Sequence, residues 1–505
     1  MPTYFKFIFL IFLLSGCAVG PDYQRSSNVI EWFDDVEDTH RMGYWWQSMD
    51  DATTNELVTA LLAQNLDLQS ALARIEQARA QYQISTGEAW PTLSANLNRT
   101  RIKQEGNNAF IAGGAPGTLG GLNNTGAGVP IGEQIPGGNL GIGGFPMQAG
   151  DYQTFYSGGL STSWQLDLFG GIRRSIYSAR ASLLASQADY DALVHTLVSQ
   201  LVRQRIAIAT LEAQLDLLQD IVTTRERTFT VVERRYLAGA NASALDVLAA
   251  RESLTSIQVQ IPDVQANLYQ ARGQLAVLLG QREQSVSRYA LLPPPTELIV
   301  APGIALLDRR PDLRRNELRL VAATNDVGVA IAALYPDVSL SLDLTKQAAR
   351  FSDLFGNNNV GGSFSVRLLQ AIFQGGRLRA NVRFSKARVK ELQAGYELAV
   401  LNAALEVDTA LFRERTLRQQ YQQQLENTET ARRAEDLALR RYRLGLADLL
   451  QLLDRQRQRA LAEQNLINLQ QAMWNNRIDL YLALGGDWFQ ADLGESTETT
   501  VNDND

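Results

Sequence analysis

The chain is poor in the residues that metal sites and many enzymes use. Its 505 residues include two histidines, His40 and His195, a single cysteine, Cys17, and five methionines. This inventory argues against His or Cys metal clusters and against Cys/His catalysis. The sequence also holds no nucleophile elbow and no phosphate loop. We therefore expect that the protein is not an enzyme and that it needs no metal or other cofactor.

A strong positive charge and long apolar runs are lacking as well. The formal net charge is −7, and no basic patch is interleaved with aromatic residues, so nucleic acid is not an expected partner. After the N-terminal segment, no stretch reaches the ~18 uninterrupted apolar residues of a membrane helix, which excludes an α-helical transporter. If the protein crosses a membrane, we expect a β-barrel, because only helices and closed barrels satisfy their backbone groups in lipid.

Residues 1–17, MPTYFKFIFLIFLLSGC, are typical of a lipoprotein signal. The apolar run Phe7–Leu14 is too short to span a bilayer. The letters LSGC resemble a bacterial lipobox, which predicts removal of residues 1–16 and a covalent lipid at Cys17. Acyl chains of this kind anchor a protein without a spanning helix. The alternative is an ordinary secretory signal with a cysteine close to its cleavage point. Ala18 in the next position favours the outer membrane, because an aspartate there would have resembled an inner-membrane retention signal.

Several short motifs that contain glycine or proline occur twice in the chain, in the same order. Three motifs recur about 205 residues later: Gly170-Gly171 at Gly375-Gly376, Tyr236-x-x-Gly239 at Tyr442-x-x-Gly445, and Leu279-Gly280 at Leu484-Gly485. Trp90-Pro91 also matches Tyr335-Pro336, at a larger offset, because a long insertion follows it in the first half. We therefore predict an internal two-fold repeat, with a first unit at 51–290 and a second at 300–486.

Both halves hold strongly periodic helical segments. Apolar residues recur at steps of three and four over 193–222 and over 398–412, which is the spacing of coiled coils and helix bundles. No proline interrupts 171–261 or 376–484. A helix over 171–238 would be on the order of 100 Å long. Such a length suggests a fibrous or tubular assembly rather than a globular core.

Four segments alternate apolar and polar residues instead, at about 91–101, 154–168, 336–347 and 361–373. A period of two with one polar face is the pattern of outer membrane barrels. Four strands cannot close such a barrel, since the smallest have about eight. They require either a soluble sandwich or pooling between subunits, and the lipobox and the long helices favour pooling.

Two other segments show no periodicity. Residues 106–150 are rich in Gly and Asn and are expected to form a long surface loop. The acidic tail, 487–505, is expected to be disordered.

Several of these residues match one family. The stretch 17–23, CAVGPDY, resembles the mature start of lipid-anchored outer membrane efflux proteins of the TolC/OprM type, in the NodT-like branch of the outer membrane factors. The run 309–313, RRPDL, resembles the opening of their second repeat. The two RY-x-x-G turns and the duplicated helix–strand–strand–helix order match as well. The resemblance covers nearly the whole chain after the signal peptide.

The resemblance implies a mixed fold that neither composition nor spacing supplies. It implies a homotrimer whose four strands per chain pool into one 12-stranded outer membrane barrel, continued by a long α-helical barrel in the periplasm. Residues 17–50, lipid-anchored and including Trp45-Trp46, would run along the outside of the helical barrel.

The implied function is an outer membrane channel that exports drugs or other small toxic compounds. It would work with a periplasmic adaptor and an inner-membrane pump, in contact with outer membrane lipid. Two alternatives stay open: the outer membrane conduit of a type I protein secretion system, and a purely structural envelope lipoprotein with coiled coils.

The same resemblance places the RY-x-x-G turns at the periplasmic tips. Gly239 and Gly445 suit the left-handed position that ends a helix. Asp246 and Asp448 lie just past the turns and are candidate adaptor contacts. Arg441 and Tyr442 match residues that tie the inner and outer coiled coils together. All of these residues belong to turns at which a pair of helices reverses direction.

A constriction is implied further along the second turn. Leu450 and Asp454 match the family's constriction residues, and Arg457 matches the arginine one turn on. With Leu461 these residues recur at steps of four, three and four, so they share one helical stripe. The adjacent stripe, Leu446, Leu449 and Leu453, is expected to pack on a neighbouring helix.

The first repeat differs here, because Ala249 and Ala250 stand where the second repeat has larger residues. We therefore expect only the second copy to line the constriction. The alternative is that Asp454 and Arg457 form an ordinary surface pair, which would stabilise a helix by roughly 0.2–0.5 kcal/mol.

Overall fold

The computed structural model describes residues 18–25, 44–103, 152–239, 242–282, 287–296, 306–356 and 360–486. The chain divides into two compact units. The sheet unit comprises Trp90–Leu166 and Asp337–Leu369, and the helical unit comprises the rest. The signal segment 1–16, the predicted lipidation site Cys17, the whole loop 106–150 and the tail 487–505 lie outside the described residues, so what the sequence predicts for them stays a prediction.

The sheet unit holds four antiparallel strands in the order β1-β2-β3-β4. Their bounds are β1 Thr92–Lys103, β2 Tyr152–Leu166, β3 Asp337–Ala348 and β4 Val360–Leu369. β4 ends at Leu369 rather than near residue 373. The side chain of Gln370 instead donates a hydrogen bond to the carbonyl of Leu334 at 3.1 Å, and this contact ends the alternation.

The register gives the sheet one apolar face and one polar face. Directly paired residues of antiparallel strands point to the same side. Leu160 pairs with Ala95 and Leu344, and these residues lie on the apolar face. The polar face carries paired hydroxyls, with Ser94 and Ser161 Oγ atoms 2.6 Å apart. The alternation predicted from the sequence is therefore present in the paired strands, and Leu160 on the apolar face is 47% exposed in the single chain.

Two very long helices organise the helical unit. α5 (Gly171–Leu237) and α10 (Arg377–Arg443) each have 67 residues, so each is about 100 Å long. Each begins after a glycine in the left-handed region, Gly170 with φ +78° and Gly376 with φ +83°. The absence of proline inside these segments, noted in the sequence, allows a single helix of this length.

Some of the remaining helices have the same length in the two halves. Their bounds are η1 Trp45–Met49, α3 Ala52–Gln64, α4 Leu66–Gly87, α6 Ala244–Gln258, α7 Gln260–Leu278, α8 Leu306–Arg309, α9 Pro311–Ala332, η2 Phe351–Phe355 and α11 Leu449–Ala483. α4 and α9 have 22 residues each, and β1 and β3 have 12 each. α6 and α7 together span as many residues as α11. They are separate because Pro262 lacks the N–H that would continue the hydrogen-bond ladder of α6.

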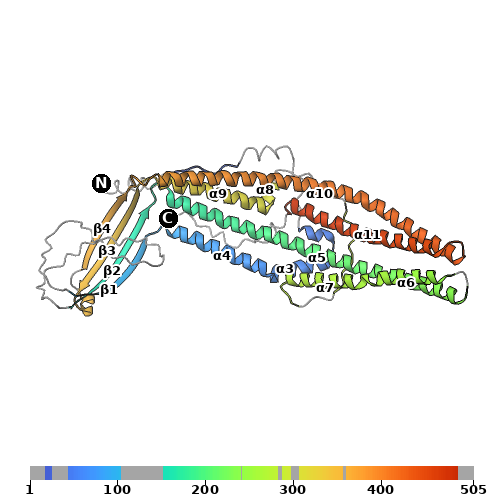
Figure 1. The fold of residues 1–505 in the computed structure, drawn as a ribbon. Helices are drawn as coiled ribbons and strands as arrows, with labels where there is room; N and C mark the ends of the chain where they lie inside the picture. The colour runs from blue at the N-terminus through green and yellow to red at the C-terminus, as the bar shows by residue number, and fades with distance from the viewer. Residues whose placement is uncertain are drawn as a thin grey trace. The chain divides into compact units, whose positions relative to one another are not determined.

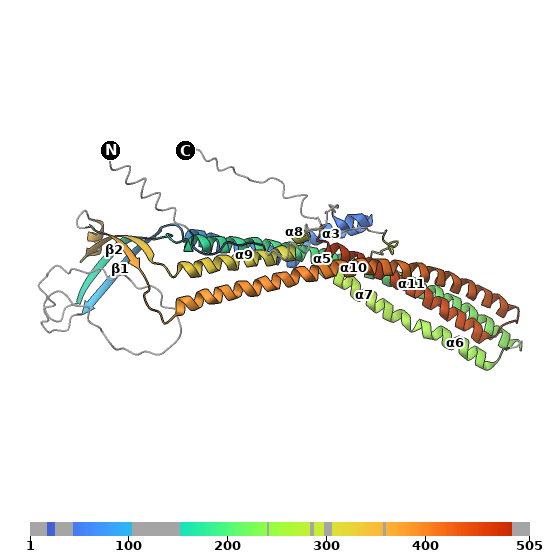
Figure 2. The ribbon, with the colours of Figure 1, turned by 90° about the horizontal axis from the view of Figure 1, so that it is seen from above.

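Figures 1 and 2 show the helical unit as two hairpins, α5 with α6 and α10 with α11, which turn at the same end of the unit. Its largest apolar cluster surrounds the middle of α5, where Leu201 and Val202 are fully buried. Trp45 and Trp46 pack into this cluster, and the Trp45 ring stacks on Tyr481 with centroids 5.2 Å apart. Within the described residues we find no helix that combines the length and the apolar composition needed to cross a membrane.

Candidate functional site at the helix tips

The two hairpin turns share one backbone conformation. Gly239 and Gly445 have φ values of +67° and +73°, in the left-handed region that favours glycine. The N–H of Gly239 donates to the carbonyl of Tyr236 at 3.1 Å, and the N–H of Gly445 donates to that of Tyr442 at 3.0 Å. Each glycine therefore satisfies a carbonyl at the end of a long helix and lets the chain reverse.

The carboxylates that follow the turns cap the next helices. Asp448 is the N-cap of α11, and its Oδ1 accepts the N–H of Gln451 at 2.7 Å. In the first copy Ser243 is the N-cap of α6, and the carboxylate of Asp246 accepts a hydrogen bond from the Ser243 N–H at 2.7 Å. Both acids thus stabilise a helix start by satisfying exposed N–H groups. Their predicted contact with an adaptor stays a prediction.

Tyr442 is the point where the two copies of the turn meet. Its side chain is 7% exposed and packs in an apolar cluster with Val232, Leu449 and Leu452. The guanidinium of Arg235 lies over the Tyr442 ring, with its carbon 4.7 Å from the centroid. The same side chain donates to the carbonyl of Tyr442 at 3.3 Å. The tips of α5 and α10 are therefore joined through one aromatic ring.

The sequence pointed to Tyr442 but not to its partner. Arg441, named together with Tyr442, contacts only its own turn in the hydrogen bonds of the described residues, donating to the Leu446 carbonyl at 3.4 Å. The residue that reaches Tyr442 is Arg235, which is the arginine of the first Arg-Tyr pair. The only signal in the sequence was the repeat, which places an Arg-Tyr pair at the end of each long helix.

The predicted stripe on α11 is exposed in the single chain. Leu450 is 64% exposed and Leu461 46% exposed. The side chains of Asp454 and Arg457 are 39% and 62% exposed. The structure thus places the four residues on one accessible face, which is the arrangement that a lumen-facing or subunit-facing stripe requires.

The adjacent stripe packs differently from the prediction. Leu449 is buried and Leu453 is partly buried, as expected. Leu446 is 64% exposed, so the expectation that it packs on a neighbouring helix is wrong for this chain. It lies in the turn before α11 begins and is therefore not on the helical stripe. Leu452, which is fully buried, packs in the tip cluster beside Leu449.

Asp454 sits among positive charges. Its Oδ1 accepts from Arg457 at 3.0 Å, and Arg455 lies 3.5 Å from its Oδ2. The hydrogen bond from Arg457 lowers the pKa of Asp454 below its ordinary value. The carboxylate therefore stays ionised at neutral pH. Within one chain, the contact is an exposed i,i+3 pair.

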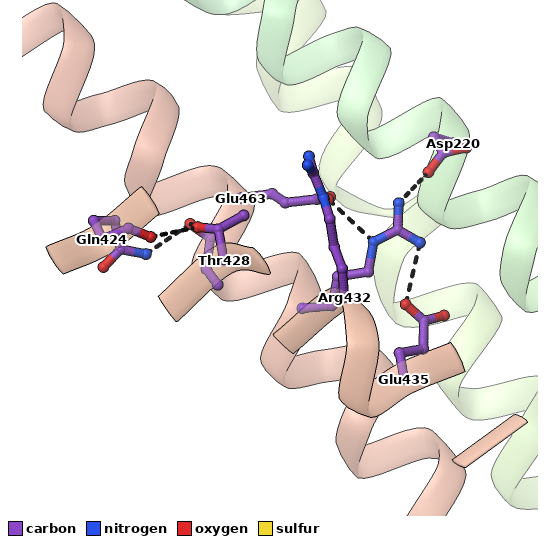
Figure 3. Close-up of polar contacts among 8 residues, drawn as sticks. Asp220, Gln424, Thr428, Arg432, Glu435 and Glu463 are labelled. Atoms are coloured by element: carbon purple, nitrogen blue, oxygen red, sulfur yellow. Dashed lines mark hydrogen bonds and ion pairs between the residues drawn. The ribbon is translucent and has the colours of Figure 1, made fainter. Parts of the chain in front are cut away.

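A cluster of charged side chains further from the tip ties three helices together. Arg459 of α11 contacts Asp220 of α5 at 3.0 Å, Glu435 of α10 at 3.1 Å and Glu463 of its own helix at 3.1 Å. Figure 3 shows the side chains of Asp220, Glu435 and Glu463 pointing toward a common centre, with Arg432 beside Glu463. Burial lowers the pKa of Arg459, but its bonds to Glu463 and Glu435 outweigh burial and raise it.

This charge cluster was not predicted from the sequence. The side chains of Glu435 and Glu463 are each 6% exposed, so the cost of burying them is offset only by their arginine partners. Charged residues at these positions look like solvated helix positions until the packing of α5 against α11 is known. Among the described residues, no group of three or more His, Cys, Asp or Glu is placed to hold a metal ion.

Comparison with known proteins gives consistent matches along the chain. The model of the outer membrane efflux protein family matches residues 57–281 and 305–486. The pyoverdine export outer membrane protein OpmQ of Pseudomonas aeruginosa is 31% identical over 452 residues, which cover 88% of this chain and 87% of OpmQ. The cation efflux system protein CusC of Escherichia coli O6:H1 is 27% identical over 496 residues, covering 94% of this chain and 97% of CusC.

A solved structure of the outer-membrane channel OprN superimposes with a TM-score of 0.79 at 29% identity, covering 94% of this chain and 100% of that chain. The match therefore includes strands, long helices and tips alike.

Proposed function

Because the chain belongs to the outer membrane efflux protein family, we propose that it is the outer membrane duct of a tripartite efflux system. The duct exports drugs or other small toxic compounds, and its periplasmic aperture is closed by the tip of α11 until an adaptor engages. The observation that carries the aperture assignment is the exposed stripe of Leu450, Asp454 and Arg457 beside a tip that Tyr442 holds together.

The family fixes the broader part of this function. The protein is an outer membrane efflux channel and not an enzyme, and channels of this family generally need no cofactor. The cargo belongs to the proposal, because the names of the relatives differ in cargo: OpmQ is named for pyoverdine export and CusC for cation efflux.

The edges of the sheet support a trimer. β1 and β4 are the outer strands of the four within the described residues. An amphipathic sheet with two open edges exposes unpaired backbone groups, which closure into a barrel removes. Three chains would supply 12 strands, with the apolar face of Leu93, Leu160 and Phe364 toward lipid and the hydroxyl face toward the lumen.

The long helix of the second half supports the same assembly. On α10 the stripe Leu398, Leu401 and Leu405 is 59%, 49% and 63% exposed. The matching positions of α5, 206 residues earlier, hold Ala192, His195 and Ser199 instead of leucines, and His195 and Ser199 are 6% and 2% exposed. An apolar stripe of this length on a soluble surface marks an interface. We assign it to the neighbouring chain of a trimeric α-helical barrel that continues the internal repeat of each chain.

In this assembly the aperture acts as a charged ring. Trimer symmetry gives three Asp454 carboxylates around one axis, which repel one another and favour hydrated cations. Leu450, one turn before Asp454, adds an apolar ring. The joint between Arg235 and Tyr442 holds α10 against α5 and keeps the rings narrow. An adaptor that binds the splayed state better shifts the equilibrium by that difference in affinity.

Single-channel conductance in planar bilayers tests this proposal. Asp454→Ala removes the three carboxylates that line the aperture and shortens the side chains there, and we expect a higher conductance with weaker preference for cations. Glu252→Ala is the matched control, because it removes one exposed carboxylate of α6, about one helical turn beyond Ala249, the position that matches Asp454. Unchanged conductance and ion preference in Asp454→Ala would contradict the aperture assignment.

The lipid anchor and the partners complete the proposal. Cys17 carries covalent lipid and holds the mature N-terminus at the outer membrane, while the helical unit extends into the periplasm. The tips at Gly239 and Gly445 face the adaptor, and through it the inner-membrane pump. Mass spectrometry of the N-terminal peptide and pull-down of the adaptor with tip variants test these two parts separately.

A further inference from the structure

Residues 18–25 lie outside helices and strands, in the helical unit, against the start of α5 and along α9. The Val19 N–H donates to the Phe169 carbonyl at 3.1 Å, just before α5 begins. Further along the segment, Tyr23 and Arg25 contact Glu317 near the beginning of α9. The segment thus binds helices of both halves.

Glycines make the backbone approach possible. Gly20 has φ +112°, and a Cβ on it would lie 2.6 Å from the Gly328 Cα of α9. A Cβ on Gly170 would lie 2.5 Å from the Ala18 Cα. A Cβ on Gly328 would lie 2.8 Å from the Arg174 side chain. Real Cβ contacts are not this short, so the cleft accepts the segment only because these positions have no side chain.

The buried side chain of Arg174 binds the segment between these glycines. The Arg174 side chain is 8% exposed and ion-pairs with Asp22 at 2.8 Å. Its Nε and Nη2 donate to the carbonyls of Val19 and Gly20, each at 3.3 Å. Its Nη1 also donates to Asn325 Oδ1 of α9 at 3.1 Å. One guanidinium therefore holds Val19, Gly20 and Asp22 of the segment and joins α5 to α9.

The far end of the segment is held by one carboxylate. Glu317 accepts from the Tyr23 hydroxyl at 2.9 Å and from Arg25 Nε at 2.8 Å, and Arg25 Nη2 reaches its other oxygen at 2.7 Å. Burial, with the Glu317 charge, raises the pKa of Tyr23, so its phenol remains a donor. Such a bidentate arginine contact fixes direction as well as position.

The spacing of these contacts shows an extended peptide. From Gly328 to Glu317 α9 rises about 16 Å at 1.5 Å per residue. From Gly20 to Arg25 an extended chain spans about 16 Å at 3.3 Å per residue. The segment therefore runs antiparallel to α9 with its contacts in register, and Pro21 keeps it from becoming helical.

We propose that this cleft, formed by Gly170 and Arg174 of the α5 start with Glu317, Asn325 and Gly328 of α9, is a docking site for the processed N-terminus of the chain. It binds residues 18–25 as a peptide and thereby fastens the lipid on Cys17, one peptide bond before Ala18, to the channel wall. The anchor is then a rigid attachment to both halves of the chain rather than a loose tether. The anchoring role depends on the lipidation in the proposed function, whereas the docking does not.

Hydrogen exchange of the full, membrane-extracted protein tests the docking, read on the peptide that contains Val19–Arg25. Gly328→Ala places a methyl group against Arg174, and we expect exchange in this peptide to rise by at least about tenfold. Gly395→Ala is the matched control, because a Cβ at this helical glycine of α10 meets nothing within 4 Å. We expect it to leave the exchange unchanged.

A second pair of variants leaves the helices of the cleft intact. Tyr23→Phe with Arg25→Met removes the contacts to Glu317 from the segment side, and exchange should rise here too. Arg319→Met is its control, because it removes an α9 ion pair with Asp189 that does not touch the segment. If exchange is unchanged in both Gly328→Ala and the double variant, the docking site is wrong.

The mass of the same N-terminal peptide separates the two parts of the proposal. An acylated Cys17 in all four variants, with faster exchange only in the cleft variants, supports a docked anchor. An unmodified Cys17 in the natural protein would contradict both the lipidation and the anchoring role, even if the segment is protected from exchange.

Discussion

The two hairpin tips have the same backbone and different side chains. Both end a 67-residue helix at a left-handed glycine, and both restart with a capping side chain, Ser243 in the first copy and Asp448 in the second. Beyond the cap they diverge. The first copy continues with Ala249 and Ala250, and the second presents an exposed Asp454. The two turns thus share a backbone conformation, and the residues after them make the two hairpins chemically different.

The difference extends to the tyrosines of the two turns. Tyr442 is 7% exposed and carries Arg235 over its ring, whereas Tyr236 is 45% exposed. In this contact the first turn supplies the arginine, Arg235, and the second turn supplies the aromatic ring of Tyr442. The two tips are therefore unequal partners in one joint, and sequence symmetry does not mean equal roles.

The largest effect is expected from breaking this joint. Tyr442→Ala should lower the free energy of local opening at the tip by about 3 kcal/mol, since it empties a buried aromatic site and removes the cation–π contact. Amide exchange at residues 438–449 should become about a hundredfold faster, and bilayer conductance should rise. Tyr236→Ala, the same change in the first copy, should cost less than about 1 kcal/mol. Equal effects of the two variants would show that the joint is not centred on Tyr442.

Substitution of either turn glycine is expected to destabilise its hairpin less than Tyr442→Ala does, and by the same amount in both hairpins. Gly239→Ala and Gly445→Ala each force a Cβ into the left-handed region, at about 1–2 kcal/mol. A Cβ at either position meets nothing within 4 Å, so neighbouring atoms add nothing to this cost. Hydrogen exchange of the two hairpins should therefore show matching losses. A difference of more than about 1 kcal/mol between them would mean that the shared backbone is not the source of the turn.

Much of the fold followed from sequence because its signals are local. Gly-Gly pairs, missing prolines and apolar spacing act within a few residues, and they placed α5 and α10 nearly to their ends. Alternation placed the strands in the same way. The end of β4 differed because it depends on the contact between Gln370 and Leu334, which are distant in the chain.

The parts that sequence could not supply are contacts between hairpins. Arg459 and its carboxylate partners, two of them buried, resemble solvated helix residues until α11 packs on α5. Arg235 reaches Tyr442 across 207 positions of the chain. Leu446 looked like a member of the apolar stripe, but α11 starts only at Leu449. Sequence periodicity identifies a face only after the helix start is known.

The central claim is that the second tip alone lines the aperture, and cadmium block of single channels tests it most directly. Asp454→Cys would place three thiols around the trimer axis, and Ala249→Cys would place them at the matching position of the first tip. Soft thiolates bind such a metal ion strongly. The account predicts that micromolar Cd²⁺ blocks the current of Asp454→Cys and leaves Ala249→Cys unaffected. Block at residue 249, or none at residue 454, would contradict it.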